Sequence, residues 1–125
     1  MNALEQFKKE KLPELAKKLG IKNVNAVPML EKVIVGIGIG SLVTRKSLKD
    51  FDEFDKNLKT ITGQKPRITK SKKAISNFKL REDLPVMMQV TLRKQRAYDF
   101  LDRFVKLALP RVRDFSGINE KSFDK

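Results

Sequence analysis

The chain contains neither cysteine nor histidine. Without cysteine, a disulfide framework and a thiolate metal site are both excluded. Without histidine, the usual general base and the commonest metal ligand are missing, and a Ser–His or Cys–His nucleophile cannot be built. The sequence therefore predicts no catalytic residues, no metal-binding residues, no cofactor and no enzymatic activity.

Long apolar segments are also lacking. The first residues have mixed charge and no apolar run, so we expect no secretory signal. The longest uncharged stretch, residues 33–44, is interrupted by glycines. It is far shorter than the roughly 20 apolar residues that a membrane span needs. These features predict a soluble, cytoplasmic protein with no membrane partner.

Two glycine patterns and one acidic cluster suggest nucleotide or magnesium chemistry, but all three fail. In the glycine run at residues 36–40, the third position of a dinucleotide fingerprint is Ser41 or Val43. Gly63-Gln64-Lys65 lacks the upstream glycine of a phosphate-binding loop. The carboxylates within residues 50–55 fall on the polar side of an expected helix. We interpret them as a solvated face rather than a metal site.

Positive charge is what the chain has in excess. Its 28 Lys and Arg against 15 Asp and Glu give a net charge of +13 and a pI near 10.1. Residues 65–96 alone hold ten basic and two acidic residues. A charge this large and this unevenly placed indicates a polyanionic partner that faces the middle third of the chain.

Hydrophobic periodicity predicts one α+β domain over residues 1–125, with a small mixed or antiparallel sheet packed with amphipathic helices. Pro13 and Gly20 mark the start and the end of the first expected helix. A further helix is expected to start at Ser47, in a capping-box pattern with Asp50. The expected helices cover residues 13–19, 47–62 and 94–109, and the expected strands cover residues 31–39, 66–70 and 84–92.

The first expected strand has one apolar face and one nearly bare face. Val33, Val35, Ile37 and Ile39 share the apolar face, and Lys32, Ile34, Gly36 and Gly38 share the other. Glycine weakens a strand, so this pattern suggests that a partner approaches the backbone closely.

Basic and polar residues around the later strands predict a phosphate-binding surface. Gln64 and Thr91 are suited to hydrogen bonds with sugars or phosphates. Phe78, the one aromatic residue in the basic connection, either stacks on a base or packs against the protein. The candidates near the strands are Lys65, Arg67, Arg93, Lys94 and Arg96, and those in the connection are Lys70, Lys72, Lys73, Asn77, Phe78, Lys79 and Arg81.

Several motifs occur together and in order. They are Gly63-Gln64-Lys65-Pro66, Val90-Thr91-Leu92-Arg93, Leu109-Pro110-Arg111-Val112-Arg113-Asp114-Phe115-Ser116-Gly117 and Lys121-Ser122-Phe123-Asp124, with Val27-Pro28, Glu31-Lys32 and Gly38-Ile39-Gly40 upstream. In these motifs the chain resembles the bacterial type of large-subunit ribosomal protein five, the family that binds 5S rRNA. The resemblance covers nearly the whole chain.

The resemblance implies a structural component of the large ribosomal subunit, located in the central protuberance and bound to 5S rRNA. It also implies contacts with 23S rRNA, with a protein of the small-subunit head and, through residues 72–83, with the P-site tRNA. Gln64 and Thr91 match family residues of the 5S rRNA contact. The residues expected at rRNA are Gly36, Gly38, Gln64, Lys65, Arg67, Thr91, Arg93, Lys94 and Arg96.

The chain departs from the family pattern in two ways. Gly36 stands where the family usually has Asn, which removes one expected polar contact. Family members also continue beyond residue 125 with strands that complete the sheet, so we expect an incomplete sheet with an open edge. That edge is covered by RNA or another chain, or the sequence is a shortened product or a fragment.

Two other function classes stay open. The protein could be a free nucleic-acid-binding regulator or chaperone outside the ribosome, and co-sedimentation with ribosomes separates this reading from the first. It could also be a small nucleotide-binding or phosphotransfer enzyme, for which the glycine run would have to bind phosphate.

Overall fold

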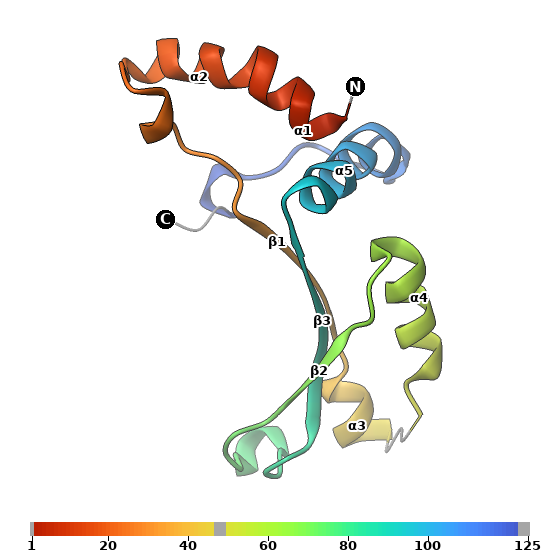
Figure 1. The fold of residues 1–125 in the computed structure, drawn as a ribbon. Coiled ribbons are helices and arrows are strands. Elements are labelled where there is room, and N and C mark those ends of the chain that lie inside the picture. Colours follow the sequence, from red (N-terminus) through yellow and green to blue (C-terminus); the bar gives the residue numbers. More distant parts are fainter. Residues whose placement is uncertain (1, 47–49, 123–125) are drawn as a thin grey trace. The chain divides into compact units, whose positions relative to one another are not determined.

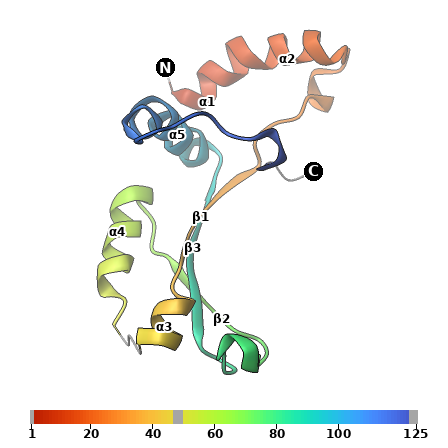
Figure 2. The ribbon, with the colours of Figure 1, turned by 180° about the vertical axis from the view of Figure 1, so that it is seen from behind.

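The computed structural model describes residues 2–46 and 50–122, which form two compact units. One unit combines the chain up to Met29 with the chain from Gln95 onward, and the other is Leu30–Lys94. The ribbon in Figures 1 and 2 shows the elements of each. Within the described residues, no helix has the length and apolar character needed to cross a bilayer.

The first unit begins with a helix that runs without a break through a proline. It consists of α1 (Ala3–Gln6), a wider π-type turn over Phe7–Lys11, and α2 (Leu12–Leu19). The first helix was predicted to start at Pro13, but Leu12 before it is already helical, with φ of −64° and ψ of −44°. The wider turn leaves room for the proline ring, which would otherwise press on the carbonyl of the preceding turn.

The second helix of this unit repeats that pattern. It consists of α5 (Gln95–Arg103), a π-type turn over Phe104–Ala108, and a final 3₁₀ turn over Leu109–Arg111. The helix was predicted to stop at Pro110, which instead lies inside the last turn. The rings of Phe7 and Tyr98 pack with their centroids 5.1 Å apart, which joins the N-terminal helix to α5.

The second unit is built on a three-stranded antiparallel sheet of order β1-β3-β2. Its strands are β1 (Lys32–Gly38), β2 (Arg67–Lys70) and β3 (Pro85–Arg93), each close to its predicted range. The two outer strands pair only with β3. The predicted α+β class is therefore confirmed, and the sheet is antiparallel rather than mixed.

The core of this unit lies on one face of the sheet. Met88, Val90 and Leu92 alternate along β3 and are buried, together with Leu58 of α4 (Asp52–Thr62). Both α3 (Gly40–Lys46) and α4 contact β3. The packing of α4 on the sheet explains why the apolar stripe predicted for this segment was easy to recognise.

Two details differ from the prediction or lie beyond the described residues. No helix was predicted between residues 40 and 46, yet α3 occupies Gly40–Lys46. Glycine and β-branched residues disfavour a helix, but contact with β3 overrides this weak preference. Ser47, the predicted cap of the next helix, lies outside the described ranges. Instead, the Asp50 carboxylate accepts a hydrogen bond from the Asp52 N–H at the start of α4.

Candidate nucleic-acid interface

The sheet of the second unit has an exposed face opposite its core. In an antiparallel pair, residues directly across from each other point to the same side of the sheet. Lys32 pairs with Arg93, Ile34 with Thr91, and Gly36 with Gln89, which in turn pairs with Arg67. We call this side the open sheet face; its members are Lys32, Ile34, Gly36, Gly38, Arg67, Thr69, Met87, Gln89, Thr91 and Arg93.

Five of the residues predicted to contact rRNA share the open sheet face: Gly36, Gly38, Arg67, Thr91 and Arg93. Gln64 and Lys65 lie in the turn that leads into β2, and Lys94 follows β3 directly. Arg96 belongs to the other unit, at the start of α5. Lys32 and Gln89 were not proposed as contacts. Strand alternation alone places Lys32 on the same side of β1 as Gly36, and Gln89 on the same side of β3 as Thr91.

The two glycines of β1 differ in the space above them. A Cβ placed on Gly36 would lie 2.1 Å from the terminal methyl carbon of Met87, so the Met87 side chain fills that space. At Gly38, no atom of the described part of the chain lies within 4 Å of the same position. The backbone is therefore open to a partner at Gly38, whereas at Gly36 a partner first has to displace a flexible side chain.

At one end of the open sheet face, two cations lie side by side. Lys32 and Arg93 are directly paired across β1 and β3, an arrangement that is unfavourable for like charges. Glu31 offsets it by an ion pair with Arg93, whose N–O distance is 3.5 Å. Both partners are more than half exposed, so the pair is weak and a phosphate can replace the carboxylate.

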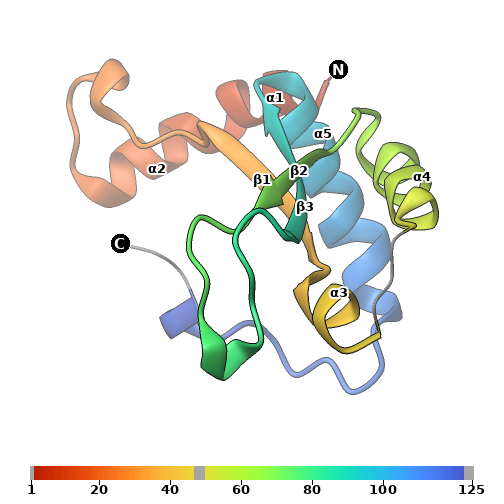
Figure 3. The ribbon, with the colours of Figure 1, turned by 90° about the horizontal axis from the view of Figure 1, so that it is seen from below.

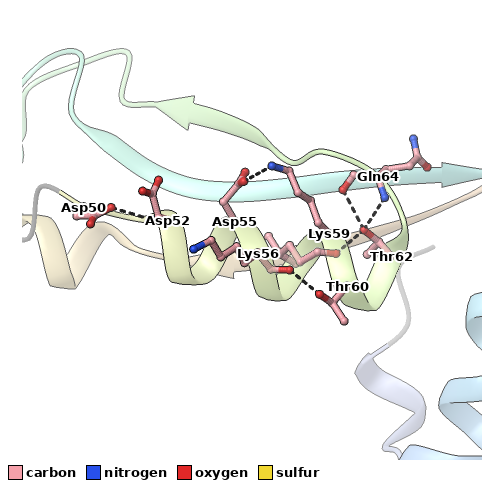
Figure 4. A network of polar contacts seen from close by, with 9 residues as sticks. Asp50, Asp52, Asp55, Lys56, Lys59, Thr60, Thr62 and Gln64 are labelled. Atoms are coloured by element: carbon pink, nitrogen blue, oxygen red, sulfur yellow. Dashed lines mark hydrogen bonds and ion pairs between the residues drawn. The ribbon is translucent and has the colours of Figure 1, made fainter.

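A buried hydroxyl holds the turn that carries Gln64 and Lys65. The Thr62 hydroxyl donates to the Leu58 carbonyl at 2.6 Å and accepts from the Gln64 N–H at 3.3 Å (Figure 4). Gly63 ends α4 in the left-handed conformation, with φ of 72°. These contacts direct the chain from α4 into β2 and fix the backbone of Gln64.

Figure 4 also shows the acidic start of α4. Asp50 bonds to the backbone of Asp52, and Asp55 forms an ion pair with Lys59 one turn later. Among the described residues, no three acidic side chains gather in a way that could hold a metal ion. Two of the carboxylates thus act locally: Asp50 accepts a backbone hydrogen bond just before the helix, and Asp55 is an ion-pair partner within it.

The basic connection between β2 and β3, residues 70–83, is an ordered hairpin extension, which we call the basic loop. Ile75 and Leu80 exchange both backbone hydrogen bonds, at 2.9 and 3.0 Å. At the base, the Ser71 N–H donates to the Leu84 carbonyl and the Ser71 hydroxyl donates to the Arg81 carbonyl. The tip is a short 3₁₀ turn, Ser76–Phe78, closed by Lys79 with a positive φ of 52°.

All seven candidate residues of the basic loop are exposed. Phe78, for which packing and stacking were both open, has 71% of its surface exposed at the tip. In the structure it is therefore free to stack on a base.

The cations of this surface follow β3 along its length instead of clustering at one point. Lys32, Arg93 and Lys94 lie near its C-terminal end, Arg67 is paired near its middle, and the basic loop precedes its first residue. At 3.3 Å per residue, Pro85 and Arg93 are about 26 Å apart. This arrangement suits an extended polyanion, or two separate stretches of one, better than a single phosphate.

Two family models match the chain. The family described as "Ribosomal protein L5" matches residues 23–81, and a second model, which describes the C-terminus of the same ribosomal family, matches residues 85–125. The chain is 48% identical over 120 residues to the large ribosomal subunit protein uL5 of Clostridium botulinum strain Hall, covering 96% of this chain and 66% of that protein. It is also 48% identical over 121 residues to uL5 of Natranaerobius thermophilus, covering 97% and 66%. The chain thus spans just under two thirds of the length of these curated relatives.

Proposed function

Because the chain belongs to the ribosomal protein L5 family, we propose that it is a non-catalytic, RNA-binding component of the large ribosomal subunit in the cytoplasm. The names of its relatives place them in the large ribosomal subunit. The net charge of +13 supports the same conclusion, since it fits a protein that lies against a nucleic-acid backbone.

The open sheet face is the proposed contact with 5S rRNA. The observation that carries this proposal is its composition: three cations, three amide or hydroxyl side chains, and an open backbone at Gly38 share one exposed surface. None of the ten residues of the open sheet face is acidic. Such a surface binds a phosphodiester backbone by charge and close approach, and orients it by hydrogen bonds.

The remaining partners follow from the rest of the surface and from the family. The basic loop is the proposed contact with P-site tRNA, because it extends from the sheet and presents exposed cations and Phe78. We propose 23S rRNA as a further partner, together with a protein of the small-subunit head. Residues 1–125 would then serve as one RNA-binding domain, in spite of their division into two compact units.

Arg93→Gln tests the 5S rRNA contact. Arg93 is half exposed on the open sheet face, and we expect its neutralisation to weaken 5S rRNA binding about fivefold in a filter-binding titration. The matched control is Lys56→Gln, which removes the same charge from the exposed side of α4. Equal losses in the two variants would mean that binding responds only to net charge, and the open sheet face would not be the site.

A further inference from the structure

Two cavities lie between α3 and the basic loop, within the second unit. They have volumes of about 580 and 500 Å³, and they share Thr44, Lys79 and Leu80 in their linings. Figure 3 shows α3 and the helical turn of the basic loop at the same end of the sheet. We call the two cavities together the α3–loop groove.

The lining of the groove combines cations from α3 and from the basic loop with apolar side chains. Arg45, from α3, lines the smaller cavity. Arg81, from the basic loop, lines the larger one, and Lys79 of the loop lines both. Of the described residues that line the two cavities, none is acidic. Leu80, Leu84 and Val86 contribute the apolar part, and Phe78 lines the smaller cavity while 71% of its surface stays exposed. Cations beside apolar and aromatic side chains fit a strand that has a charged backbone and flat bases.

Both walls are held in place before any partner arrives. The wall formed by α3 is tied to the sheet because the Ile39 N–H donates to the Val86 carbonyl at 2.9 Å. Gly40 allows this approach, since a Cβ there would lie 3.3 Å from a methyl of Val86. The loop wall is held by the paired backbone bonds of Ile75 and Leu80. A preorganised groove loses little conformational entropy on binding.

We propose that the α3–loop groove holds a single strand of the RNA that the basic loop contacts, with Arg45 on α3 as a phosphate-binding residue. The inference rests on the proposed tRNA contact of the loop and adds a second wall to it. The strand lies between Arg45 on one side and Lys79 and Arg81 on the other. Phe78 provides a stacking surface for a base at the rim.

Arg45→Gln tests the second wall, with purified tRNA and 5S rRNA as separate probes. We expect tRNA affinity to fall about fivefold and the slope of its salt dependence to fall by about one unit. Binding of 5S rRNA should stay within about twofold, because Arg45 does not belong to the open sheet face. Lys56→Gln is again the matched control and should leave both affinities unchanged.

The outcomes distinguish this inference from the proposed function of the basic loop. If Lys79→Gln weakens tRNA binding and Arg45→Gln does not, the loop still contacts tRNA, but the proposal that the groove holds an RNA strand is wrong. If neither variant affects tRNA while 5S rRNA still binds, the loop contact itself fails. Displacement of tRNA by polyglutamate at the same charge concentration would show that the groove binds any polyanion, and this would also overturn the proposal.

A second measurement does not depend on affinity. Because the chain has no cysteine, Ser41→Cys gives a single attachment point for a hydroxyl-radical source on α3, in the lining of the groove. We expect strong, local cleavage of bound tRNA from this position. Asn57→Cys, on the exposed side of α4, should give little. Equal or absent cleavage from the two positions would contradict a strand in the groove.

Discussion

At the scale of single residues, a substitution at Gly38 can separate the stability of the fold from RNA binding. An alanine methyl there meets no atom within 4 Å, and alanine is less costly than glycine in a strand. We therefore expect Gly38→Ala to keep or slightly raise the free energy of unfolding, while RNA that approaches the backbone meets the new methyl. Filter binding should show weaker 5S rRNA binding, by about threefold or more. Unchanged affinity would exclude close approach at this position.

Thr62 offers the opposite test, of a residue that acts on stability. Thr62→Val keeps the shape but leaves the Gln64 N–H without its hydroxyl partner. We expect the free energy of unfolding to fall by about 1 kcal/mol, measured as a lower urea midpoint. Thr60→Val is the matched control, because the Thr60 hydroxyl also bonds back to a helix carbonyl but is exposed (Figure 4). A drop in the urea midpoint of the same size in Thr60→Val would show that the turn does not depend on the buried hydroxyl.

Residue types and strand alternation were enough to predict which residues share much of the candidate interface. The twofold period of a strand places Gly36 and Gly38 on one side, and Thr91 and Arg93 on one side of β3, before any coordinates are known. Alternation cannot reveal the Met87 methyl above Gly36 or the ion pair between Glu31 and Arg93. Both depend on side-chain conformations that are set across strands.

At the scale of elements, the basic loop and the sheet should be separable. Neutralising Lys72, Lys73 and Lys79 to Gln removes three exposed charges without touching the hydrogen bonds of Ile75 and Leu80 that hold the hairpin. We expect tRNA binding to weaken about tenfold or more, with 5S rRNA binding within about threefold of the parent. Loss of 5S rRNA binding in this variant would mean that the loop is part of that contact.

Elements with strong periodicity were predictable, and those set by tertiary contact were not. The stripe of α4 and the alternation of β3 gave both elements to within a few residues. The helix α3 was missed because Gly40, Val43 and Thr44 are poor helix formers. The passage of a helix through Pro13 was missed because the wider turn before it has no sequence signal.

At the scale of the whole molecule, charge should set the salt dependence of binding. If about eight phosphates are neutralised, the logarithm of 5S rRNA affinity should fall against the logarithm of salt concentration with a slope near −7. A titration in KCl by filter binding measures it. A slope near zero would remove the electrostatic mechanism, whatever the affinity.

Composition predicted the class of partner, but it could not predict where the basic residues lie relative to one another in the sheet. An excess of lysine and arginine between residues 65 and 96 indicates a polyanion. It does not give the strand order β1-β3-β2, which decides that Lys32, far from that segment in sequence, lies beside Arg93. Strand order depends on long-range pairing, which local propensity does not encode.

The central position of β3 has a consequence for synthesis on the ribosome. In the sheet, β1 and β2 are not neighbours. Each pairs with β3, which leaves the ribosome after both of them. The nascent chain thus carries two unpaired strands until Arg93 has left the exit tunnel, and both then pair with β3 in one late step. Translational pausing before that residue would prolong the exposure of two unpaired strands, which can associate with other chains.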